Sequence, residues 1–202
     1  MKHLLTCSMA GLMALSSAML AQNTAEGKKV KAVEKPVSYH ASVPAPTLSG
    51  VRYGTHERNV LDFWRAESDA PTPLAFVIHG GGWTGGSKER LHRFADTSAL
   101  LKAGISVVAI NYRFTRQAAE SGVEPPVKAP LHDAARALQF VRSMARDWNI
   151  DKERVGAAGG LAGACSSLWL AYHDDLADPT SKDPIARESS RLWCAAVNGA
   201  QT

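Results

Sequence analysis

The chain has 202 residues, enough for one domain with a substantial hydrophobic core. Hydrophobic residues make up 45% of the sequence and charged residues 21%, which excludes an intrinsically disordered protein. The formal net charge is only +4, and the lysines within residues 28–35 are not interleaved with aromatic residues. No nucleic-acid partner is therefore expected.

The first residues are typical of an exported protein. Met1-Lys2-His3 is basic, residues 4–20 are mostly apolar or small, and Ala18 and Ala21 fit the small residues that precede a cleavage site. We therefore expect a secretory signal peptide over residues 1–21 and a periplasmic or extracellular location. A stable membrane anchor is not expected, because the apolar stretch is shorter than a usual span and contains Ser16-Ser17.

Removal of a signal peptide would leave two cysteines, Cys165 and Cys194. An oxidising compartment allows a disulfide between them. Their apolar sequence neighbours favour the alternative, in which both are buried thiols that pack as small hydrophobic residues.

Residues 22–49 lack any hydrophobic periodicity, and their prolines keep the backbone extended. They are predicted to form a linker that need not pack, and the folded domain is predicted over residues 50–202. Its first elements are a hairpin, with strands at 51–54 and 59–64.

Strands and helices then alternate along the chain. Unbroken apolar runs, rich in β-branched residues, predict buried strands, and apolar positions three and four apart predict helices between them. Strand–helix–strand units of this kind form parallel sheets with right-handed crossovers. The fold class is therefore α/β, with a mostly parallel sheet and helices on both faces. The predicted strands are 74–78, 105–110, 154–158 and 192–197, and the predicted helices are 88–103, 131–148 and 164–172. Asp133 is expected in the first turn of its helix, where its charge suits the helix dipole.

The segment His79-Gly80-Gly81-Gly82-Trp83 follows the strand at 74–78 directly. Three glycines allow a sharp turn and bring bare backbone N–H groups close to a ligand. A flexible glycine turn with no ligand is the alternative that these five residues leave open. His79 is expected to brace the loop through a hydrogen bond rather than to do chemistry.

Four segments in order resemble the α/β-hydrolase family, and within it the H-G-G-G esterases of the hormone-sensitive-lipase and bacterial feruloyl-esterase types. They are residues 79–83, Val107 to Arg113, the helix from Asp133 to Arg142, and the glycine cluster at 159–163. The resemblance implies an α/β-hydrolase fold and a small-molecule ester as substrate, with no cofactor. It also implies that the amides of Gly81, Gly82 and Ala162 form an oxyanion hole.

The chain departs from the family at the nucleophile. The family places a serine at the centre of G-x-S-x-G, whereas this turn is built by Gly159, Gly160 and Gly163 around Leu161. Leucine has no lone pair and cannot form an acyl-enzyme. The neighbouring Cys165, Ser166 and Ser167 lie within the following helix, so they are not expected to replace the nucleophile.

A second departure concerns the acid and the base of the triad. The family places an aspartate or glutamate, and then a histidine, after later strands. Here the aspartates of residues 174–183 precede the last predicted strand, and no histidine follows His173. The resemblance therefore implies a domain that is incomplete at its C-terminus. The histidine spacings do not indicate a metal site.

Three functions are consistent with this pattern. The first is an inactive member of an exported carboxylic-ester hydrolase lineage. The second is a binding module that keeps the acyl pocket without catalysis. The third is descent from peptidase-type α/β hydrolases.

Overall fold

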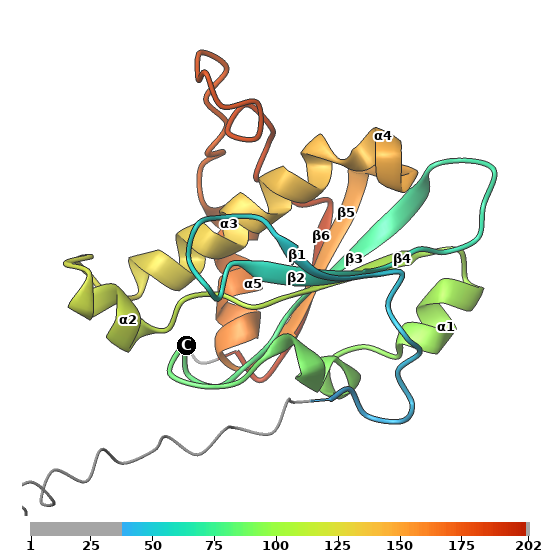
Figure 1. Cartoon of the computed structure of the whole chain (residues 1–202), viewed down its shortest axis with the longest axis horizontal. Helices are drawn as coiled ribbons and strands as arrows, with labels where there is room; N and C mark the ends of the chain where they lie inside the picture. Colours follow the sequence, from blue (N-terminus) through green and yellow to red (C-terminus); the bar gives the residue numbers. More distant parts are fainter. Residues whose placement is uncertain (1–37, 201–202) are drawn as a thin grey trace, which may run out of the picture. The chain divides into compact units, whose positions relative to one another are not determined.

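The computed structural model describes residues 38–200 (Figure 1). The predicted signal peptide over residues 1–21 lies outside the described residues, as does the predicted linker before residue 38. Within residues 38–200 we find no helix with the length and apolar character that a bilayer span requires.

The centre of the domain is a six-stranded sheet with the order β1-β2-β4-β3-β5-β6. The pairs β4–β3, β3–β5 and β5–β6 are parallel, whereas β1 and β2 form an antiparallel hairpin and β2 pairs antiparallel with β4. The predicted hairpin and the mostly parallel sheet are both confirmed. The strands are β1 Leu48–Arg52, β2 Val60–Trp64, β3 Thr72–Ile78, β4 Ser106–Ile110, β5 Ile150–Gly160 and β6 Cys194–Asn198.

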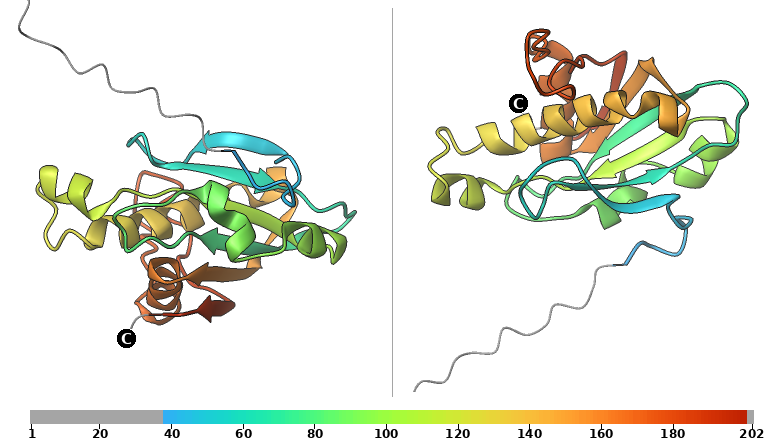
Figure 2. Two further views of the ribbon diagram at one scale, coloured as in Figure 1. Left: turned by 90° about the horizontal axis from the view of Figure 1, so that it is seen from below. Right: turned by 45° about the horizontal axis from the view of Figure 1, so that its top comes forward.

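Helices cover both faces of the sheet, as predicted (Figures 1 and 2). Along β3, side chains alternate between two hydrophobic clusters because successive residues of a strand point to opposite faces. Phe76 and Ile78 lie in the cluster with Leu138 of α3, and Val77 lies in the cluster with Leu91 of η1. The helical segments are η1 Lys88–Arg93, α1 Thr97–Lys102, α2 Thr115–Glu120, α3 Lys128–Ser143, α4 Ala145–Trp148 and α5 Ala162–Tyr172.

The helices differ from the sequence prediction in their continuity. The helix predicted over 88–103 is a 3₁₀ segment followed by α1, because the side chain of Asp96 accepts a hydrogen bond from the Ala99 amide and begins a new helix. The helix predicted over 131–148 begins earlier, at Lys128, with Pro130 tolerated in its first turn, and it is interrupted at Met144. Helix α2 lies in a segment where no helix was predicted.

The described end of the predicted linker packs against the domain. The Tyr39 hydroxyl donates to Asp62 Oδ2 at 2.7 Å, and Trp64 Nε1 donates to the Pro44 carbonyl at 2.8 Å. Val43 is buried in the same cluster as Trp64. Residues 38–49 are therefore not a free linker, because buried polar groups of β2 find their partners there.

Candidate functional site

Two loops meet at the carboxyl ends of β3 and β5. These strands are parallel neighbours, and Ile78 pairs with Gly159. A side chain at Gly80 would lie 2.6 Å from the Gly160 carbonyl oxygen and 3.4 Å from Leu161 Cβ, and one at Gly163 would overlap the Ile78 carbonyl oxygen. The sheet thus brings the glycine loop and the turn at 159–163 into backbone contact, which only glycine permits.

Leu161 holds the turn between β5 and α5 in a strained conformation. Its dihedral angles are φ 53° and ψ −121°, a region that residues with a Cβ rarely adopt. Such a residue costs about 1–3 kcal/mol and persists only where its surroundings impose it. Its amide donates to the Asn198 carbonyl of β6 at 3.1 Å, its carbonyl accepts from the Cys165 amide, and its side chain is 50% exposed.

The glycine loop itself turns through a run of positive φ angles. Gly81, Gly82 and Trp83 have φ of 121°, 61° and 56°. The Gly81 carbonyl accepts from the amides of Thr84 and Gly85, and a side chain at Gly81 would overlap the Gly85 carbonyl. Within residues 38–200, we find no hydrogen bond from the amides of Gly81, Gly82 and Ala162 to another residue.

His79 supports the glycine loop through a hydrogen bond, as predicted. Its ring is buried and stacks on Tyr112, with centroids 4.3 Å apart, and its Nδ1 lies 2.8 Å from the Gly80 carbonyl oxygen. The Tyr112 hydroxyl donates to the His79 carbonyl at 2.8 Å. Burial lowers the pKa of His79 to about 4, so the imidazole is neutral at pH 7.

Trp83 ties the glycine loop to α5, a contact that the sequence analysis missed. Its indole Nε1 donates to Ser166 Oγ at 3.0 Å, and that hydroxyl donates to the Ala162 carbonyl at 2.9 Å. The Trp83 carbonyl accepts from the Thr115 amide at 2.9 Å. Only the presence of a tryptophan in the loop could have indicated this contact, because a buried indole N–H needs a hydrogen-bond acceptor.

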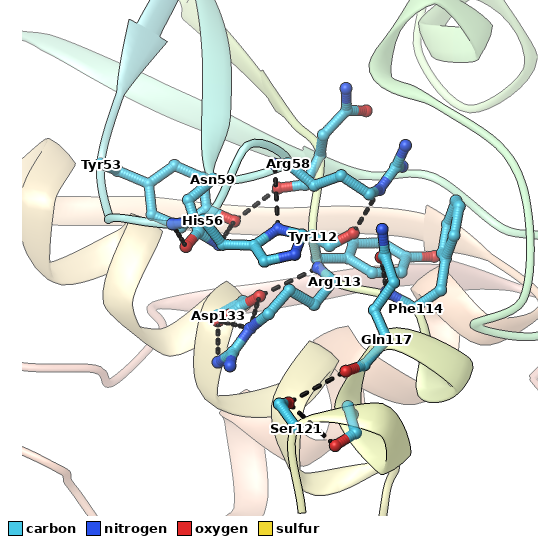
Figure 3. A network of polar contacts seen from close by, with 12 residues as sticks. Tyr53, His56, Arg58, Asn59, Tyr112, Arg113, Phe114, Gln117, Ser121 and Asp133 are labelled. Carbon is cyan, nitrogen blue, oxygen red and sulfur yellow. Dashed lines mark hydrogen bonds and ion pairs between the residues drawn. The ribbon is translucent and has the colours of Figure 1, made fainter. Parts of the chain in front are cut away.

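A network of arginines holds the segments that flank the site (Figure 3). Arg58 donates to the Tyr112 carbonyl at 2.7 Å and to the Gly86 carbonyl at 3.0 Å, and its guanidinium lies over the Phe114 ring. Arg113 forms an ion pair with Asp133, Nη2 to Oδ1 at 2.6 Å. The predicted role of Asp133 in the first helical turn is wrong: α3 begins at Lys128, and Asp133 instead binds the amide and side chain of Arg113 in the segment that follows β4.

The serines and aspartates near the turn that could supply a nucleophile or the acid of a triad make other contacts. Ser166 and Ser167 are buried, and each hydroxyl donates to a backbone carbonyl one turn earlier in α5. Asp175 accepts from Ser189 and Ser190, and Asp183 pairs with Arg136 at 2.6 Å. These aspartates therefore serve the loop between α5 and β6.

The two cysteines of the domain are not joined. Cys165 is partly buried in α5, and Cys194 is exposed at the start of β6, so the disulfide alternative is wrong and Cys194 is no buried thiol. Among residues 38–200, no three His, Cys, Asp or Glu side chains are grouped so that they could hold a metal ion.

With this geometry in place, comparison with known proteins identifies the family. The BD-FAE family model matches residues 61–193. The chain belongs to the BD-FAE family. Its relatives include a probable carboxylic ester hydrolase, LipM, of Mycobacterium tuberculosis, 33% identical over 151 residues, which are 72% of this chain and 32% of LipM. Versiconal hemiacetal acetate esterase of Dothistroma septosporum is 27% identical over 77% of this chain and 43% of its own length.

Solved structures show the same fold for this BD-FAE member. The acetyl ester-xyloside bifunctional hydrolase of Caldicellulosiruptor lactoaceticus superimposes with a TM-score of 0.56 at 30% identity, over 68% of this chain and 48% of that one. Thermogutta terrifontis esterase 2 gives a TM-score of 0.61 at 21% identity. The fold is that of α/β hydrolases, and the family is one of carboxylic ester hydrolases. The chain spans less than half the length of both curated relatives described above.

Proposed function

We propose that this chain carries the ester-binding part of a carboxylic ester hydrolase site and that, with Leu161 at the nucleophile position, it forms no acyl-enzyme. The observation that carries the proposal is the backbone of Leu161, which keeps a strained strand–turn–helix conformation that leucine itself disfavours. A strained residue between β5 and α5 fits the turn that presents a nucleophile in hydrolases of this fold.

The chemistry follows from the groups at the turn. The amides of Gly81, Gly82 and Ala162 would donate to the carbonyl oxygen of a bound ester, and α5 adds the partial positive charge of its N-terminus. The Leu161 side chain offers no electron pair to the carbonyl carbon. The ester would therefore be polarised but not cleaved.

Esters are favoured over peptides as the ligand class. The relatives include an acetate esterase and an acetyl ester-xyloside hydrolase, so p-nitrophenyl acetate is the first ligand to test. We further propose that the protein is exported, on the basic and apolar character of its first residues. N-terminal sequencing of the protein recovered from the periplasm or medium of an expressing bacterium would test this, and an intact Met1 there would contradict it.

The Leu161→Cys variant tests the site without requiring a histidine base, because a thiolate is nucleophilic on its own. Its sulfur would attack the carbonyl carbon of p-nitrophenyl acetate, forming a thioester and releasing p-nitrophenolate, while the thiol proton passes to solvent. Iodoacetamide is the comparator, since its alkylation generates no oxyanion. Both rates are measured at residue 161 and, as an internal control, at the exposed Cys194 by mass spectrometry of peptides.

The ratio of acetylation to alkylation separates oxyanion stabilisation from simple exposure or a lowered thiol pKa. Loss of one oxyanion donor typically costs about 10²–10³-fold, so we expect the ratio at residue 161 to exceed that at Cys194 by about 10²-fold. Equal ratios at the two positions would overturn the proposal. Leu161→Ala should give no acetylation at residue 161.

A further inference from the structure

A hollow of about 290 Å³ lies between the first turns of α3 and the last turn of α5. Its centre is the indole of Trp169, which two imidazoles flank. The ring of His132, from α3, has its centroid 5.7 Å from that of the indole, and the ring of His173, directly after α5, lies at 4.2 Å. Three apolar side chains add to the lining, namely Pro125, Val127 and Leu131. Most of the wall of this hollow is therefore apolar or aromatic.

Two basic side chains border the hollow on the side of α3. Lys128 and His132 are four residues apart in this helix, so they project from the same face of it. Both also line a neighbouring hollow of about 500 Å³, to which Arg113 contributes from the segment after β4. The two hollows therefore share a border of basic groups.

The positive charge of this border is only partly balanced by carboxylates. Burial lowers the pKa of His132, and the nearby charge of Lys128 lowers it further. Asp133 opposes this effect, but its carboxylate is held by Arg113, with Nη2 and Oδ1 2.6 Å apart (Figure 3). Glu124 lines the larger hollow, yet within the part of the chain that the structure describes we find no ion pair of Lys128. An anion bound at this border would supply the missing negative charge.

We propose that this hollow binds a small amphiphilic carboxylate, with its carboxylate group at Lys128 and His132 and its apolar chain against Trp169. The class follows from the lining: basic side chains recognise an anion, and apolar walls remove a hydrocarbon chain from water. An inorganic anion would leave the apolar wall unused. The volume is close to the lower limit for pockets that hold small molecules, so the chain is short.

This site lies apart from the turn at 159–163. Trp169 is about 12 Å along α5 from Leu161, at 1.5 Å per helical residue. The proposal therefore does not rest on the proposed ester-binding function.

Octanoate is the probe, and octanamide, which has the same chain and no charge, is the comparator. NMR spectra of the full chain with isotope-labelled tryptophan report on each indole N–H, and Trp169→Phe assigns the signal of Trp169. We expect octanoate to shift this signal until the site is saturated. Octanamide should bind about fivefold more weakly, since it lacks the ion pair. A shift of the exposed Trp193 indole alone would overturn the proposal, because the chain would then bind to another apolar surface.

The Lys128→Gln variant should raise the dissociation constant for octanoate about fivefold, the effect of losing one partly exposed ion pair. Lys102→Gln is the matched control, because it removes the same charge from α1, on the opposite face of the sheet, and should leave the constant unchanged. Both lysines are exposed, so neither change should disturb folding. Equal constants for the two variants, equally tight binding of octanamide, or no saturable shift at Trp169 would overturn the proposal. None of these measurements involves residue 161, so the outcome is separate from that of the ester-binding test.

Discussion

The indole of Trp83 and the hydroxyl of Ser166 are joined by a hydrogen bond of 3.0 Å that connects the glycine loop after β3 to the first turns of α5. The same hydroxyl donates to the Ala162 carbonyl, so the loop that contains Gly81 and Gly82 is tied to the helix that begins with Ala162. The spacing of the three proposed oxyanion donors therefore depends on two residues that contribute no donor themselves.

Trp83→Phe should keep most of the packing and lose this hydrogen bond. We expect the free energy of unfolding to fall by about 1 kcal/mol, in the range for one hydrogen bond between side chains. Urea denaturation of Trp83→Phe, Ser166→Ala and the double variant measures the coupling. Additive losses in the double variant would show that the two residues do not act together. In the Leu161→Cys background, Trp83→Phe should slow acetylation by p-nitrophenyl acetate more than alkylation by iodoacetamide.

Leu161→Gly should stabilise the protein, because glycine adopts the conformation at φ 53° and ψ −121° without the penalty that a Cβ incurs. The expected gain in the free energy of unfolding is about 1–2 kcal/mol, reduced by the greater backbone entropy of glycine in the unfolded state. Leu161→Ala is the control, since it removes the exposed side chain but keeps the Cβ. Equal stabilities of the two variants would mean that the turn is not strained.

His79 should make stability depend on pH. Its pKa is about 4 in the folded protein against 6.5 for an ordinary histidine, so the unfolded state takes up the proton first as the pH falls. The contribution of neutral His79 is complete above pH 6.5 and is lost as the pH falls toward 4, at up to ~1.4 kcal/mol per pH unit. Urea denaturation between pH 7.5 and 4.5 measures the slope. His79→Phe should reduce the slope of the free energy of unfolding against pH by the contribution of one proton. An unchanged slope would contradict the lowered pKa of His79.

The Arg113–Asp133 pair should matter far more than the exposed pair Arg116–Glu120. Asp133 is 6% exposed, and its carboxylate accepts from both the side chain and the amide of Arg113. Asp133→Asn should therefore lower the free energy of unfolding by about 2–4 kcal/mol, because it leaves the Arg113 charge without its partner. Glu120→Gln breaks a pair whose side chains are 84% and 66% exposed, so it should cost less than about 0.5 kcal/mol. Similar losses would show that burial does not decide the difference.

The sequence predicts the fold well where a local pattern determines the structure. The strand at 74–78 is an unbroken apolar run closed by glycine, and the β-branched run at 105–110 pairs parallel with it as expected. The prediction failed where one side chain interrupts a pattern: apolar periodicity continues through residues 88–103, but the Asp96 side chain starts a new helix there. Residues 38–49 lack hydrophobic periodicity, so the sequence predicts a linker there; their contacts, such as Tyr39 with Asp62, are made across more than twenty residues and leave no local pattern.

The candidate site, like the fold, could be predicted from the sequence only in part. The glycines of the loop and of the turn at 159–163 could be placed from their spacing and from the family resemblance, since only glycine permits such close backbone contact. The contact between Trp83 and Ser166 could not, because no spacing rule relates residues 83 positions apart. The exposure of Cys194 could not be predicted either, because its apolar sequence neighbours are typical of a buried strand.

The backbone conformation at position 161 is imposed by neighbouring residues, through the contacts of Gly159 and Gly163 with the end of β3 and the hydrogen bond to Asn198. The side chain at position 161 can therefore change during evolution while the backbone of the turn is kept. A single codon can remove or restore the reactive atom at this position while the scaffold around it persists.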